Sequence, residues 1–158
     1  MNTQKWLAAG LISLSALAVG VVPAQASTAG SSQTKEAYVK QLKPGVKAYA
    51  RAVKGIDREI DKAPKQTDAQ VAAKFTTLTK QVTASGKQIE AVKAPSAFAA
   101  RQKAVTGSIR LVARDTARIV RAAQAHSEKQ AERAGAALGR DLKKSARALN
   151  ALDKALDA

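Results

Sequence analysis

Apolar residues recur along most of this chain at alternating spacings of three and four, the repeat of one face of an α-helix. Four such stripes follow one another, over residues 39–60, 71–92, 98–123 and 131–156. Polar residues fill most of the positions between them, so the pattern predicts an all-α protein in which each helix buries one face. The polar residues that fall on the stripes are Ser85, Gln102, Thr116 and Ser145. Because buried polar groups need partners, we expect these four to fix the register of the helices.

The ends of the helices are marked by prolines and by a change of phase. Pro64 and Pro95 separate the first three stripes, whereas Pro44 lies within the first and predicts either a kinked continuous helix or a second helix that begins there. The third and fourth stripes are offset by two residues, which a continuous helix does not accommodate easily, so we expect a break near residues 125–127. The expected helices span about 34–62, 67–93, 95–125 and 127–157.

Two pairs of residues have the spacing of a capping box at the start of a helix. They are Thr67 with Gln70, and Ser127 with Gln130. The similar helix lengths and short connections predict an up-down-up-down antiparallel four-helix bundle. The alternative is a three-helix rod with one long C-terminal helix, which dimerises to cover its exposed stripe.

The first 26 residues have the pattern of a cleaved secretory signal peptide. Lys5 precedes an uncharged, mostly apolar run over residues 7–22, and Ala24-Gln25-Ala26 resembles a cleavage site. We expect a flexible segment over 27–33, one helical domain over 34–158, and no transmembrane segment in the mature chain. The predicted location is outside the cytoplasm, either extracellular, periplasmic or associated with the cell envelope.

Candidate catalytic chemistry is sparse. The chain has no cysteine and one histidine, His126, which falls at the expected break between helices. A metal or haem site would need further ligands that the sequence lacks, and no carboxylate falls on a stripe, so we expect no metal, no cofactor and no enzymatic activity. Gly135 and Gly139 have the spacing of glycines that let two helices approach closely, and we expect that role here.

Charge is the strongest functional signal. Lys and Arg number 27 against 12 Asp and Glu, a net charge of +15, which becomes +14 without Lys5. On the third helix the arginines are expected on the outer side, with Asp115 as the one acid among them. The basic faces of the first and third helices should point in opposite directions, which forms a belt. The candidate polyanion-binding residues are Lys40, Lys47, Lys54, Arg110, Arg114, Arg118, Arg121, Arg133, Arg140, Arg147 and Lys154.

These patterns predict a non-enzymatic, exported and basic helical bundle that associates with anionic components of the cell envelope. The expected partner is an anionic surface polymer or lipid headgroups. Specific nucleic-acid binding is not expected, since the basic faces carry no aromatic residues that could stack on bases. One alternative is a protein-interaction or oligomerisation module, with a homo-oligomer among its forms. Another is a small-ligand-binding bundle that uses Gln102 and Thr116.

Overall fold

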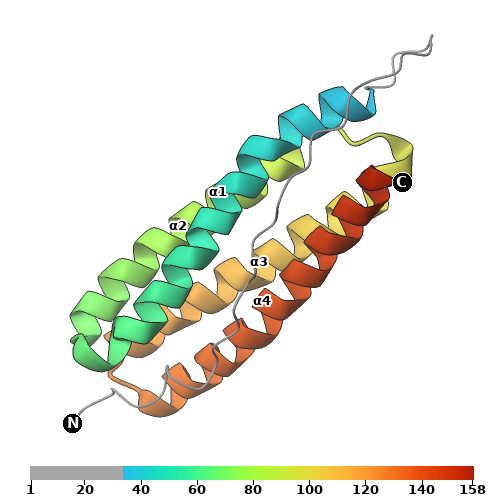
Figure 1. Cartoon of the computed structure of the whole chain (residues 1–158). Coiled ribbons are helices and arrows are strands. Elements are labelled where there is room, and N and C mark those ends of the chain that lie inside the picture. Colours follow the sequence, from blue (N-terminus) through green and yellow to red (C-terminus); the bar gives the residue numbers. More distant parts are fainter. Residues whose placement is uncertain (1–33) are drawn as a thin grey trace.

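The computed structural model describes residues 34–158, which form four α-helices and no strand. The helices are α1 (Lys35–Lys62), α2 (Asp68–Ala91), α3 (Ser96–Gln124) and α4 (Glu128–Asp157), with a short 3-10 turn, η1 (Ala63–Lys65), after α1. Figure 1 shows the four helices side by side, as in a helical bundle. The all-α prediction is therefore confirmed for these residues, and the alternative with one long C-terminal helix is wrong. The predicted signal peptide over residues 1–26 and the segment 27–33 lie outside the described residues.

Pro44 lies inside α1, which continues through it as one helix. The proline lacks the N–H that would bond to the carbonyl of Lys40, so the helix loses one hydrogen bond there. Its ring is exposed to solvent, and buried positions continue on both sides of it, from Tyr38 to Tyr49. Of the two interpretations of this proline, the continuous helix is the one observed.

Only one of the two expected capping boxes forms. At the start of α2, the hydroxyl of Thr67 accepts a hydrogen bond from the Gln70 backbone N–H at 3.3 Å, and Gln70 Oε1 accepts from the Thr67 N–H at 2.9 Å. At the start of α4, Ser127 occupies the N-cap position, but its side chain makes no capping hydrogen bond. The capping-box prediction is confirmed for Thr67 and wrong for Ser127.

Backbone hydrogen bonds of His126 and Ser127 form the turn between α3 and α4. His126 adopts a left-handed backbone conformation with φ of 51°. Its N–H bonds to the Ala123 carbonyl at 3.1 Å, and the Ser127 N–H bonds to the Ala122 carbonyl at 3.0 Å, which is the Schellman pattern that ends a helix. The exposed His126 ring also lies 2.6 Å from the Asp68 carboxylate at the start of α2. The chain therefore ends α3 without glycine or proline.

The core lies between the apolar faces of the four helices. Consecutive helices pack closely along their lengths, whereas α1 and α4 touch at few positions. One of the contacts between α1 and α4 is a hydrogen bond in which the Tyr49 hydroxyl donates to Ser145 Oγ at 2.7 Å. Near the start of α1, an apolar groove of about 90 Å³ separates the two helices; it is lined by Val39, Leu42, Lys43, Val46, Lys47, Leu149, Leu152, Asp153 and Leu156.

Glycines bring helices together at positions other than the expected ones. A Cβ added to Gly45 would lie 2.8 Å from Ile89 Cγ1, and one added to Gly86 would lie 3.0 Å from Ile109 Cγ2. At Gly135 and Gly139 an added Cβ would meet nothing within 4 Å. The predicted close approach at Gly135 and Gly139 is therefore wrong, because the tight contacts lie at the α1–α2 and α2–α3 interfaces instead.

The polar residues on the stripes all find partners inside the bundle. Gln102 accepts from the Tyr38 hydroxyl at 2.9 Å and donates to the carbonyls of Ile89 and Val92, both at 2.7 Å. Thr116 and Thr79 bring their hydroxyls within 2.9 Å of each other. Ser85 and Ser145 each donate to a backbone carbonyl on their own helix. These contacts join α1, α2, α3 and α4 at defined positions, which is the structural role expected from the sequence.

Candidate polyanion-binding site

All eleven residues predicted to bind a polyanion are exposed. They occupy α1, α3 and α4, and most of them line no cavity. The exception is the end of the molecule where α3 runs into α4. There a cavity of about 240 Å³ is lined by Arg118, Arg121, Gln130, Arg133 and Ala134, which we call the arginine pocket.

The arginine pocket forms because of the turn at His126. Arg118 and Arg121 belong to the last two turns of α3, and Arg133 belongs to the first two turns of α4. Reversal of the chain between them brings the three guanidinium groups to one cavity. The other eight predicted residues do not line it. Gln130 was expected to cap α4 and instead contributes its amide to the pocket wall.

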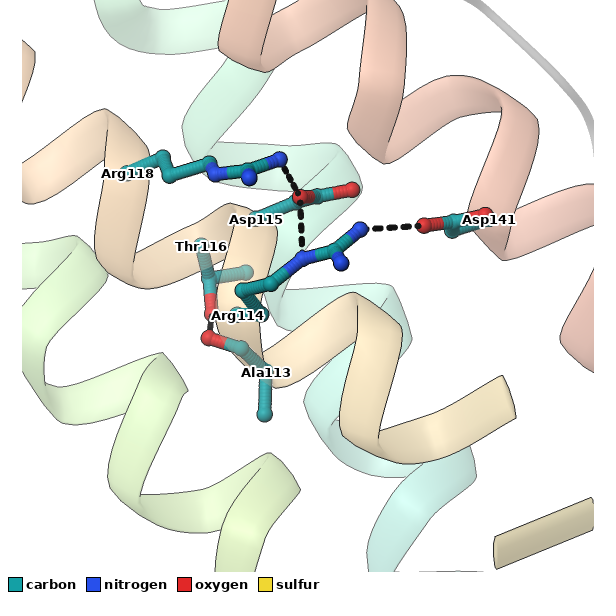
Figure 2. A network of polar contacts seen from close by, with 6 residues as sticks. All are labelled: Ala113, Arg114, Asp115, Thr116, Arg118 and Asp141. Carbon is teal, nitrogen blue, oxygen red and sulfur yellow. Dashed lines mark hydrogen bonds and ion pairs between the residues drawn. The ribbon is translucent and has the colours of Figure 1, made fainter. Parts of the chain in front are cut away.

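A buried carboxylate binds one of the pocket's arginines. Asp115 has an exposed fraction of 0%, which corrects its predicted place on the outer side of α3. Its Oδ1 accepts hydrogen bonds from Arg118 Nη1 at 2.9 Å and from Arg114 Nε at 3.3 Å. Figure 2 shows Arg114 between two carboxyl groups, because its Nη2 also lies 3.5 Å from Oδ2 of Asp141 on α4. Two arginines that looked free in the sequence are therefore partly neutralised.

Burial raises the pKa of Asp115 above its ordinary value, and the neighbouring Asp141 carboxyl raises this pKa further. The charges of Arg114 act in the opposite direction. Among the described residues, Asp115 Oδ2 is buried without a hydrogen-bond donor. A proton on the Asp115 carboxyl would remove a buried negative charge near a second carboxyl group, which is the direction in which its pKa is shifted.

The sequence carried a signal for buried Asp115 and half-buried Asp141 that the stripe positions alone did not reveal. Asp115 follows Val112 by three residues and precedes Ile119 by four. Asp141 likewise follows Leu138 by three residues and precedes Ser145 by four, and both of these lie on the stripe of α4. Positions three and four residues from two core residues lie at the border of the buried face. A carboxylate there with arginines nearby on the same helix is a candidate for a buried ion pair.

The remaining arginines differ in how far they are neutralised. Arg110 forms an ion pair with Glu90 of α2, and both side chains are at least half exposed. Arg121 and Arg133 make no hydrogen bond or ion pair with any residue in the described part of the chain. The arginine pocket therefore concentrates positive charge that the protein itself does not neutralise.

No protein-family model, curated protein or solved structure matches this chain. Among the helices over residues 34–158, none is both long and apolar enough to cross a membrane. The geometry and charge of the pocket and of the surrounding basic faces therefore carry the functional information.

Proposed function

We propose that this protein is an exported, non-enzymatic helical bundle that associates with anionic components of the cell envelope. The observation that carries the proposal is the convergence of Arg118, Arg121 and Arg133 on one cavity at the α3–α4 seam. The wider basic faces of α1, α3 and α4 would attract the same partner from a distance, since a strongly positive surface raises the local concentration of anions. An anionic surface polymer and anionic lipid headgroups are the partner classes that fit.

The proposed frame for this surface is an up-down-up-down antiparallel bundle. Pairs of residues in contact support it, because their order reverses at each interface that we can compare. Along α1 and α2, Gly45 lies against Ile89 and Gly55 lies against Leu78. Along α3 and α4, Arg114 reaches Asp141, and Arg121 meets Arg133 at the shared pocket. In this frame α1 and α3 are diagonal, so their basic faces point in opposite directions and form a belt around the bundle.

The distribution of aromatic residues favours an envelope polyanion over specific nucleic-acid recognition. Within residues 34–158, Tyr38, Tyr49 and Phe75 are buried, and Phe98 stacks on Tyr38 with ring centroids 5.6 Å apart. No aromatic side chain in this part of the chain is free to stack on an unpaired base, which is a main source of affinity for single strands. Export through the predicted signal peptide would also separate the protein from the chromosome.

The experiment that tests this function is sedimentation of the purified protein with anionic and neutral lipid vesicles, and with cell-wall polymer, over a range of salt concentrations. We expect binding to the anionic material that falls steeply with salt. At about 1 M salt the Debye length is near 3 Å, so retention that is unchanged there would contradict the electrostatic mechanism. N-terminal sequencing of protein recovered outside the cytoplasm tests export, and the expected first residue is Ser27.

A further inference from the structure

The arginine pocket has features that the rest of the basic surface lacks. Its lining comes from two helices, so the packing of α3 on α4 brings its residues together. Two of its arginines, Arg121 and Arg133, make no ion pair or hydrogen bond elsewhere within residues 34–158. Their N–H donors are therefore available to a ligand.

The third arginine is held in place from behind. Arg118 Nη1 donates to the fully buried Asp115 at 2.9 Å (Figure 2), while the Arg118 side chain keeps 45% of its surface exposed. A guanidinium group has five N–H donors in one rigid plane, so one bond to Asp115 leaves others free. Because the buried carboxylate restrains this side chain, Arg118 loses less conformational freedom when it binds a ligand.

The volume and the donor set together indicate the size and chemistry of the ligand. At about 240 Å³ the cavity is smaller than the roughly 300–1,000 Å³ of pockets for drug-sized molecules, so it suits one small group. Guanidinium groups bind oxyanions through paired N–H donors, and a phosphate offers more acceptor oxygens to several such groups than a carboxylate does. Gln130 adds an amide that can donate to a further oxygen.

We propose that the arginine pocket binds a single phosphate-class anion, a phosphomonoester or phosphodiester group, between Arg118, Arg121 and Arg133. This inference rests on the proposed association with anionic envelope components and names the chemical group that the protein would grip there. Phosphate groups of a surface polymer and of a lipid headgroup share this chemistry, and dimethyl phosphate serves as a minimal probe for both.

The test is calorimetric titration of the purified protein with inorganic phosphate and dimethyl phosphate, with acetate at equal ionic strength as the carboxylate probe. We expect saturable binding of both phosphates at one site and at least tenfold weaker binding of acetate. Arg121→Gln and Arg133→Gln should each weaken phosphate binding roughly tenfold or more, because each removes charged hydrogen bonds. Arg101→Gln on α3 and Lys144→Gln on α4 are matched controls, which change the net charge equally but lie outside the pocket and outside the eleven candidate residues.

The controls should bind phosphate within about twofold of the unmodified protein, since exposed charges beyond a Debye length are largely screened. Equal losses in pocket and control variants would overturn the inference, as would acetate binding as tight as phosphate or the absence of saturation. Vesicles carrying phosphatidylglycerol then separate the two proposals. Salt-sensitive vesicle binding without saturable phosphate binding refutes only the pocket, whereas phosphate saturation without binding to any envelope material refutes only the broader function.

Discussion

Replacing single glycines by alanine should stabilise the protein on α4 and destabilise it on α1. In a helix interior, alanine is favoured over glycine by roughly 0.8–1.0 kcal/mol. At Gly139 an added Cβ meets nothing within 4 Å, so that preference should be obtained almost in full. We expect Gly139→Ala to raise the free energy of unfolding by about 0.5–1 kcal/mol.

Gly45→Ala has the same intrinsic gain but introduces a clash. Its Cβ would lie 2.8 Å from Ile89 Cγ1, 3.2 Å from the Ile89 backbone nitrogen and 3.3 Å from Gln88 Cβ. Because a backbone atom is among these neighbours, α1 and α2 would have to move apart. Overpacking of this kind costs about 1–3 kcal/mol, which leaves a net destabilisation of about 0–2 kcal/mol after the helical preference is included.

Comparing the two variants isolates the packing cost. Both changes restrict the unfolded chain in the same way, so that contribution cancels, and the free energies of unfolding should differ by about 1–3 kcal/mol. Urea unfolding followed by far-UV circular dichroism measures this difference, provided that the m-values agree. The free energy of unfolding of Gly55→Ala should lie between those of the other two variants, since the added Cβ would meet only the flexible end of Leu78, at 2.7 Å. Equal stability of Gly45→Ala and Gly139→Ala would refute the reasoning.

Three further predictions concern ionisation, hydrogen bonding and capping. Since the folded pKa of Asp115 is raised, the native state binds more protons between the unfolded value of about 3.9 and the folded value, and stability falls as pH rises through that range. Urea unfolding from pH 4 to 7 should show a smaller loss of stability with rising pH in Asp115→Asn than in the unmodified protein. An equal loss in both proteins would contradict this prediction. Burial raises the pKa of Tyr49 to about 12. Tyr49→Phe removes the hydrogen bond to Ser145 and should lower the free energy of unfolding by about 0.5–1.5 kcal/mol, but by little in a Ser145→Ala background. A double-mutant cycle that shows no coupling between the two residues would exclude this hydrogen bond. Thr67→Ala should lower the free energy of unfolding by about 1 kcal/mol, as measured by thermal or urea unfolding. Ser127→Ala should leave it almost unchanged, because the Ser127 side chain caps no N–H.

The arrangement of buried polar groups shows how far the sequence pattern reaches. Gln102 and Ser145 could be placed in the core from spacing alone, because a helix presents every third or fourth residue to the same side. Their partners could not, since Tyr38 is 64 residues from Gln102 and Tyr49 is 96 residues from Ser145. A pattern along one helix contains no information about which neighbouring side chain lies opposite.

The same reason accounts for the errors at the candidate site. Asp115 was expected among the arginines on the outer side of the third helix, and the folded structure buries it completely. The eleven basic residues were predicted correctly as exposed, but the sequence did not distinguish the three that share a cavity. Arg118 and Arg133 meet because the chain reverses at His126, where φ is 51°.

The sequence by itself determined the helices, their buried faces and the strong positive charge, because helical periodicity and composition are properties of local chain segments. The tertiary structure decided which glycines allow close approach, which carboxylate is buried and which arginines converge. Each of these depends on the distance between two helices, and that distance is set by all the side chains packed between them at once.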